Sequence, residues 1–146
     1  MIKRRKSTPG RLLTKKLDSA FSELVRRRSK GVCAMSKVLP DVCESPVNDW
    51  RKMDNSHTAH SRVYSSLRYD FDNCDALCKS CHFKVHKNPL IVHDFKWKQL
   101  GSEGMRRLID KRNTIIKRFD HDKQELLDEI ERELAIEREN DYNYGE

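Results

Sequence analysis

The chain has 146 residues, of which 36% are hydrophobic and 36% are charged, and its net charge is +7. This length fits one modest domain with extensions, and so low an apolar fraction predicts a small core that needs a local staple such as a bound metal. No apolar run approaches the roughly 20 residues that cross a bilayer, and no apolar segment follows the basic start Met1–Lys6. These features count against a membrane-spanning or secreted protein and predict a cytoplasmic one.

The two ends of the chain carry opposite charge. Basic residues dominate residues 1–30, whereas acidic residues dominate residues 122–146. A basic front end favours a polyanionic partner, and nucleic acid is the simplest such partner. The candidate phosphate contacts are Arg26, Arg27, Arg28, Arg62 and Arg68.

The first element predicted in chain order is a helix that follows a flexible arm. Residues 1–12 are predicted to be this basic arm, because Pro9-Gly10 interrupts regular structure. The helix is predicted to start with Thr14 as its N-cap and to end at Gly31. Its apolar residues recur at helical spacing, at Leu13, Leu17, Phe21, Leu24 and Val25.

The middle of the chain is predicted to contain two short strands and a helix. After an irregular segment, a strand is predicted over residues 50–57 and a long loop from Thr58 to Asp72. A second strand is predicted at Ala76-Leu77, and a helix over residues 79–87.

Helices are also predicted for the rest of the chain. Asn88-Pro89 combines an N-cap with a proline at the first helical position, and this helix is predicted to end at Gly101. Ser102 caps the next helix, which runs to about Arg112. A capping box at Asp122 opens a final acidic helix. The apolar stripe of this last helix either packs on its own domain or supplies a homodimer contact.

The five cysteines favour metal binding over disulfides in a cytosolic chain. Cys78 and Cys81 form a Cys-x-x-Cys pair, which can supply half of a tetrahedral zinc site. Upstream, Cys33 and Cys43 are the only thiols available for the other half. Because their spacing is wider than in usual zinc knuckles, Cys74 is the alternative to Cys43.

Two histidines follow the Cys-x-x-Cys pair directly. His82 and His86 are four residues apart, so a helix places them on one face, where they could share a second cation. Two metal-type patterns in one short segment predict one ion for structure and another for chemistry.

The order of His57, Asn73 and the Cys78-x-x-Cys81-His82 segment resembles that of the HNH (His-Me finger) endonucleases. Within this superfamily, the chain is most similar to small phage HNH proteins and to the NinG/Rap-type recombination endonucleases. The resemblance covers about residues 13–119. It is also carried by Arg62, Leu67–Asp70, Cys74–Leu77, Asn88-Pro89, Trp97 and Leu100-Gly101.

The resemblance implies an α+β, mostly helical fold. A small zinc-stabilised ββα-metal core would be flanked by N- and C-terminal helices. Residues 13–119 would form the zinc-containing nuclease domain with its leading helix, and residues 120–146 the acidic C-terminal helix and tail. If a phage encodes the chain, the compartment would be the host cytoplasm.

The resemblance also implies an enzyme, a metal-dependent DNA endonuclease that hydrolyses phosphodiester bonds in duplex or branched DNA, including recombination intermediates. His57 would be the general base toward water, and Asn73 would orient it and the surrounding loop. His82, with His86, would hold a catalytic Mg²⁺ or Mn²⁺.

Departures from the family pattern leave alternatives open. His60 competes with His57 for the role of base. Ser56 stands where relatives often have a metal ligand, so either Asp54 compensates or the cation depends on the two helical histidines. A second function is therefore a catalytically inactive zinc module that binds nucleic acid or a protein partner.

Overall fold

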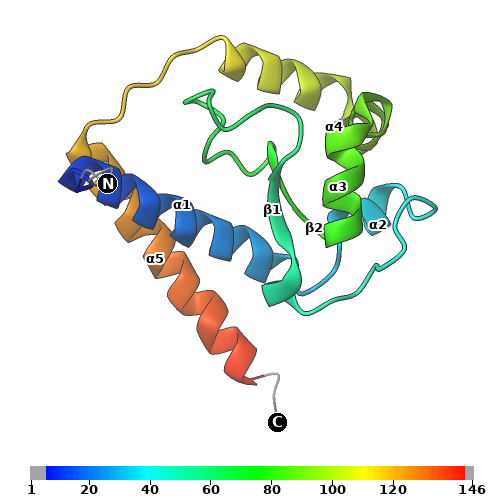
Figure 1. The fold of residues 1–146 in the computed structure, drawn as a ribbon, viewed down its shortest axis with the longest axis horizontal. Helices are drawn as coiled ribbons and strands as arrows, with labels where there is room; N and C mark the ends of the chain where they lie inside the picture. The colour runs from blue at the N-terminus through cyan, green and yellow to red at the C-terminus, as the bar shows by residue number, and fades with distance from the viewer. Residues whose placement is uncertain (1–5, 144–146) are drawn as a thin grey trace, which may run out of the picture. The chain divides into compact units, whose positions relative to one another are not determined.

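The protein is α+β and mostly helical, as expected from the sequence (Figure 1). The computed structural model describes residues 6–143. The elements are α1 (Pro9–Arg28), α2 (Ala34–Val38), the 3₁₀ turn η1 (Trp50–Lys52), β1 (Asp54–His57), β2 (Cys74–Leu77), α3 (Lys79–Lys87), α4 (Pro89–Arg112) and α5 (Asp120–Asn143). Among the described helices, none combines the length and apolar character needed to cross a membrane.

The chain divides into two compact units, and the boundary between them falls inside α1. We call the chain up to Leu24 together with the chain from Arg118 the terminal unit, and Val25–Lys117 the central unit. The terminal unit buries apolar side chains at helical spacing on both of its helices: Leu17, Phe21 and Leu24 on α1 and Leu127, Ile130 and Leu134 on α5. These residues belong to the two predicted stripes, so both stripes are core.

Helix α1 begins at Pro9, earlier than predicted. Proline has no N–H to donate and its fixed φ suits the first helical turn, so Pro9 starts the helix instead of interrupting it. The N–H of Arg11 donates to Thr8 Oγ1 at 3.4 Å, which makes Thr8 the capping residue. Thr14, the predicted cap, lies inside the helix and donates its hydroxyl to Gly10 O. The predicted arm over residues 1–12 is therefore wrong from Pro9 onward, and residues 1–5 lie outside the described part.

The central unit is built around an antiparallel pair of short strands (Figure 1). Asp54 pairs with Leu77 and His57 with Cys74, so the histidine lies where β1 ends and β2 begins. All four residues of β2 are buried. β1 starts later than predicted, because η1 occupies its first positions: the carboxylate of Asp49 accepts from Arg51 N at 3.0 Å and caps this turn.

The helical boundaries near Pro89 and Gly101 follow the predicted chemistry. Asn88 Oδ1 accepts from Leu90 N at 3.0 Å, as an N-cap does. Gly101 has φ 69° and ψ 177°, so it bends α4 at the point where two separate helices were predicted. α5 begins two residues before Asp122, whose Oδ2 accepts from Phe119 N.

Candidate metal centres

Four cysteine sulfurs come together in the central unit. The ligand atoms of Cys33, Cys43, Cys78 and Cys81 all lie within 4.8 Å of one another. Four sulfurs bound tetrahedrally at about 2.3 Å from zinc would be about 3.8 Å apart, and the Cys43 and Cys78 sulfurs are 4.0 Å apart. This cluster could therefore hold a structural metal such as zinc. Cys74 lies on β2 and is not one of the four.

A closed loop explains how Cys33 and Cys43 meet despite their wide spacing. Cys33 N donates to Pro46 O at 2.9 Å, and Asn48 N donates to Gly31 O at 2.7 Å. These two bonds join the ends of the loop that contains both cysteines. Gly31 has φ +77°, and a Cβ there would lie 2.0 Å from Asn48 O, so the closure requires glycine.

The other two cysteines stand at the N-terminal end of α3. Cys78 is the N-cap of this helix, and Cys81 is buried in its first turn. The N–H of Cys78 donates to Cys33 Sγ at 3.3 Å, so the two halves of the cluster are hydrogen-bonded. A helix N-terminus favours negative charge, which suits thiolate ligands.

The electrostatics of the cluster would favour a bound cation. Burial raises the pKa of Cys33 to about 11, and burial is also the main cause that raises the pKa of Cys81. Burial acts in the same direction on Cys78, but hydrogen bonds from Cys81 and the neighbouring thiols outweigh it and lower the pKa of Cys78. Four thiolates together in this buried cluster would require a bound metal ion to balance their charge.

His82 and His86 form a second group on α3. Their Nε2 atoms are 3.0 Å apart. Two nitrogens at adjacent octahedral positions, each about 2.1 Å from one cation, would also be about 3.0 Å apart. His82 is half-buried and His86 is exposed. Within residues 6–143, no third His, Cys, Asp or Glu ligand atom completes this pair into a larger group.

Asp54 links β1 to this histidine pair. Its Oδ2 is 2.8 Å from His82 Nδ1, and its Oδ1 accepts from Lys79 Nζ. Burial acts to raise the pKa of Asp54, but the hydrogen bonds from Lys79 and His82 outweigh it and hold the pKa below its usual value. Asp54 therefore contacts the nitrogen of His82 that points away from His86. Ser56, by contrast, is buried, with 2% of its surface exposed.

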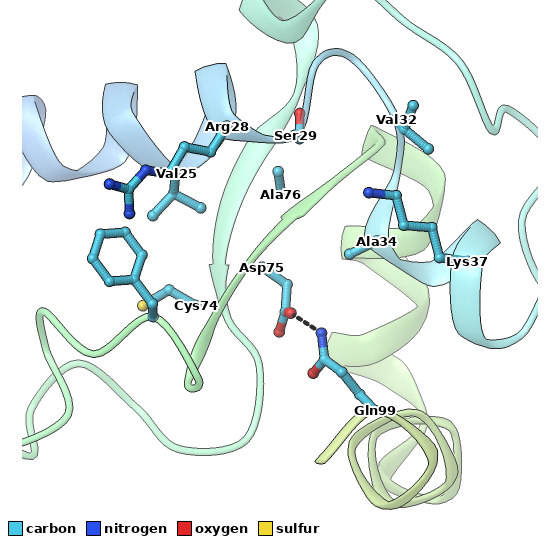
Figure 2. A pocket seen from close by; sticks show the side chains of 11 residues that line it. Val25, Arg28, Ser29, Val32, Ala34, Lys37, Cys74, Asp75, Ala76 and Gln99 are labelled. Carbon is cyan, nitrogen blue, oxygen red and sulfur yellow. Dashed lines mark hydrogen bonds between the residues drawn. The ribbon is translucent and has the colours of Figure 1, made fainter. Parts of the chain in front are cut away.

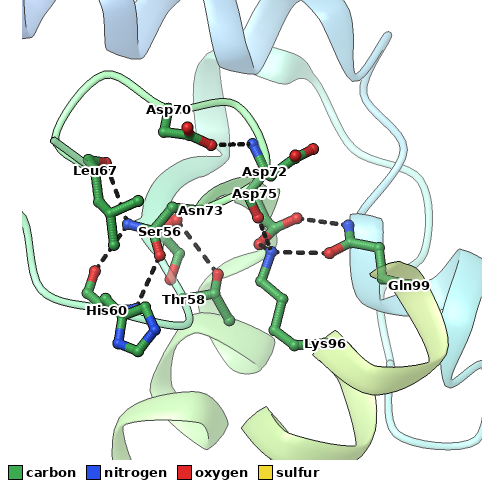
Figure 3. Close-up of polar contacts among 10 residues, drawn as sticks. All are labelled: Ser56, Thr58, His60, Leu67, Asp70, Asp72, Asn73, Asp75, Lys96 and Gln99. Atoms are coloured by element: carbon green, nitrogen blue, oxygen red, sulfur yellow. Dashed lines mark hydrogen bonds and ion pairs between the residues drawn. The ribbon is translucent and has the colours of Figure 1, made fainter. Parts of the chain in front are cut away.

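Asn73 fixes the long loop that follows β1 (Figure 3). It is completely buried. Its Oδ1 accepts from His60 N at 2.8 Å, and its Nδ2 donates to His60 O at 2.9 Å and to Leu67 O at 3.3 Å. The ring of His57 is held by the same loop, because its Nε2 lies 2.9 Å from Arg68 O, which can only accept.

His60 is the competing histidine of this loop. Its ring Nε2 is closed to solvent and has no hydrogen-bond partner among the described residues. Burial is the main cause that lowers the pKa of His60, and the nearby charge of Arg112 acts in the same direction. The side chain of Asn73 holds the backbone of His60 through both its N–H and its carbonyl.

A buried ion pair between α4 and β2 was not predicted from the sequence (Figure 3). Lys96 is fully buried in α4, and its Nζ lies 2.5 Å from Asp75 Oδ2 and 2.7 Å from Asp72 O. Gln99 donates to the other oxygen of Asp75 at 2.7 Å and accepts from Lys96. The signal was a lysine and an aspartate at positions where apolar neighbours predict burial. This network ties α4 to β2.

Two surface features complete the central unit. Near η1, three guanidinium groups gather at the ring of Trp50. Those of Arg27, Arg51 and Arg26 lie 4.1, 4.9 and 5.5 Å from its centroid.

A pocket of about 220 Å³ opens beside β2 and is lined by residues that include Arg28 and Phe71 (Figure 2). The guanidinium of Arg28 lies 4.6 Å from the ring centroid of Phe71.

The remaining candidate phosphate contacts lie in the loop after β1. Arg62 is exposed, and Arg68 is half-buried with its guanidinium 5.8 Å from the Tyr69 ring centroid. The structure thus gathers the four cysteines and pairs the two helical histidines, while His57 and Asn73 are both hydrogen-bonded to the loop after β1.

Comparison with known proteins finds no matching family, curated protein or solved structure. The geometry alone therefore carries the functional argument.

Proposed function

We propose that the protein is a metal-dependent DNA endonuclease with an HNH-type centre. The observation that carries this proposal is the 3.0 Å separation of the Nε2 atoms of His82 and His86 beside the β1–β2 pair. Two imidazole nitrogens so close together suit one divalent cation. The cysteine cluster at the start of the same helix supports a separate structural role for zinc.

His57 is the proposed general base. The carbonyl of Arg68 accepts from its Nε2, so the neutral ring has its lone pair on Nδ1 and can take a proton from water. His60 is the weaker candidate, because its Nε2 is closed to solvent. Asn73 would act by keeping the backbone of this loop in place.

The donor set suits a cation with open coordination positions. A divalent cation, when bound, would stabilise negative charge on the scissile phosphate and on the leaving oxygen. His82 and His86 would supply two nitrogen ligands and leave the other positions to water and phosphate. Imidazole is a better ligand for transition metals than for Mg²⁺, which prefers oxygen, so these residues fit Mn²⁺ better than Mg²⁺.

The basic residues around Trp50 are the proposed contact to the DNA backbone. Arg26 and Arg27 from the last turn of α1 meet Arg51 of η1 at this ring. η1 directly precedes β1 in sequence. Guanidinium groups bind phosphates without reading sequence, and such binding weakens as salt rises. Duplex and branched DNA are both proposed substrates.

A cleavage assay tests the proposal. Linear duplex, single-stranded DNA and a four-way junction are incubated with Mg²⁺ or Mn²⁺ and with the wild type, His57→Ala or His93→Ala. His93 is the matched control, because it is an exposed histidine paired with Asp94. We expect cleavage by the wild type and His93→Ala and none by His57→Ala. If the wild type binds DNA but cuts none of the three, the chain is instead a nucleic-acid-binding zinc module.

A further inference from the structure

The carboxylate of Asp54 is engaged on both of its oxygens by residues of α3. Oδ2 is 2.8 Å from His82 Nδ1, and Oδ1 accepts from Lys79 Nζ. Asp54 and His82 each expose only about a quarter of their side-chain surface, 26% and 27%. The bond between them is therefore partly shielded from water, while Lys79 is 72% exposed.

This contact decides which nitrogen of His82 carries the proton. An ionised carboxylate can only accept, so Nδ1 of His82 must donate. The neutral ring then has its lone pair on Nε2, which is the atom 3.0 Å from His86 Nε2. A hydrogen bond from the far nitrogen to a carboxylate is also what fixes the ring orientation of metal-binding histidines.

We propose that Asp54 is a positioning residue that holds His82 as the Nδ1–H tautomer and thereby strengthens cation binding by the His82–His86 pair. This inference rests on the cation site of the proposed function. Asp54 is not itself a ligand, because it contacts the opposite nitrogen of His82 and its second oxygen faces Lys79.

The role of Lys79 gives the proposal a specific signature. In Asp54→Asn, the amide oxygen stays toward Lys79, because an amide NH₂ turned toward the ammonium would set two donors against each other, and the amide NH₂ then faces His82 Nδ1. Nδ1 must now accept, which moves the ring proton to Nε2 and blocks ligation there. An aspartate-to-asparagine change beside a catalytic histidine is known to impose the wrong tautomer in this way.

Removing Lys79 from that variant should reverse the effect. In Asp54→Asn/Lys79→Met, the amide is released to turn, so its oxygen accepts from His82 Nδ1 again. A purely structural role for Asp54 predicts the opposite, because the double variant has lost more contacts than the single one.

The test measures Mn²⁺ binding to the 146-residue, zinc-loaded chain by the electron paramagnetic resonance of free Mn²⁺. The tautomer of His82 is read separately from its ¹⁵N chemical shifts without Mn²⁺. His82→Ala identifies the site. Asp49→Asn is the matched control, because Asp49 also accepts from a basic residue but contacts Arg51 and no histidine in the described structure.

We expect Asp54→Asn to weaken Mn²⁺ binding 10- to 100-fold, by analogy with other outer-shell carboxylates, and the double variant to recover most of this loss. Unchanged ¹⁵N shifts in Asp54→Asn, unchanged affinity or absence of Mn²⁺ binding by the wild type would each overturn the proposal. Asp54-dependent Mn²⁺ binding without DNA cleavage would count against the nuclease function alone. Cleavage with Asp54-independent Mn²⁺ binding would overturn the positioning role alone.

Discussion

The cysteine cluster and the His82–His86 pair share helix α3 but differ in completeness. The cluster gathers four sulfurs within 4.8 Å, and three of its residues are buried. The pair supplies two nitrogens from a half-buried and an exposed side chain. A complete, buried donor set leaves no coordination position for a substrate, whereas an incomplete, accessible one does. The difference separates a candidate structural centre from a candidate reactive one.

The two groups also arise differently from the chain. The histidine pair needs only one turn of helix, because residues four apart share a face. The cluster needs both α3 and a loop that is closed by hydrogen bonds between residues far apart in sequence. Damage to the cluster should therefore destabilise the fold, whereas damage to the pair should remove only cation binding.

The largest effect should follow loss of the cluster metal. We expect a chelator that strips zinc, or Cys81→Ser, to unfold the central unit, because structural zinc contributes on the order of 10 kcal/mol in small zinc domains. Circular dichroism with thermal unfolding, together with zinc analysis, measures this. Cys74→Ala is the matched control, since Cys74 is buried on β2 outside the cluster and should cost only about 1 kcal/mol.

That comparison has a clear failing outcome. If Cys81→Ser and Cys74→Ala lower the melting temperature equally while the wild type contains no zinc, the four sulfurs are ordinary buried thiols. The cluster would then lose its distinction from the histidine pair.

The next largest effect should come from Gly31. Gly31→Ala places a Cβ 2.0 Å from Asn48 O at φ +77° and so opens the loop that brings Cys33 to Cys43. We expect a loss of about 4 kcal/mol or more and reduced zinc content. Gly101→Ala is the matched control: φ there is +69° and ψ is 177°, but no atom lies within 4 Å, so only the conformational cost of about 1–3 kcal/mol applies. Equal losses would show that loop closure does not support the cluster.

Local chemistry made part of the structure predictable from sequence. Asn88-Pro89 fixed the start of α4 because an N-cap and a proline at the first helical position act within one turn. Helical periodicity likewise predicted the placement of His82 and His86. Where a residue acts locally in either of two ways, as Pro9 does, the prediction was wrong, since proline can interrupt a helix or begin one.

Long-range contacts set the limit of prediction. The sequence left Cys43 and Cys74 as alternatives, because the bonds that join Gly31–Cys33 to Pro46–Asn48 have no local signature. The ion pair of Lys96 and Asp75 was also missed: apolar neighbours indicate that both positions are buried, but only the packing of α4 on β2 makes the two residues partners. The contact from Asp54 to His82 crosses from β1 to α3 and follows only from the fold.

The variant Asn73→Ala tests whether the candidate reactive centre depends on the hydrogen bonds that hold the loop after β1. Asn73→Ala would leave His60 N, His60 O and Leu67 O without their partner, so we expect a loss of roughly 3 kcal/mol. Cleavage should fall further than stability explains, while zinc content stays unchanged. Denaturant unfolding, zinc analysis and the DNA assay measure the three quantities. Asn88→Ala, which removes an exposed cap, should cost about 1 kcal/mol and leave cleavage intact.

The smallest effect on stability, and the sharpest on function, should come from His86. His86→Ala removes an exposed ring, so we expect the free energy of unfolding to stay within about 0.5 kcal/mol of the wild type. Mn²⁺ binding should nevertheless fall at least as far as for loss of an outer-shell partner, by 10-fold or more. His93→Ala, an exposed histidine of α4, should change neither quantity. If His86→Ala binds Mn²⁺ as the wild type does, the 3.0 Å contact is only a hydrogen bond between two rings, and His82 has no partner in cation binding.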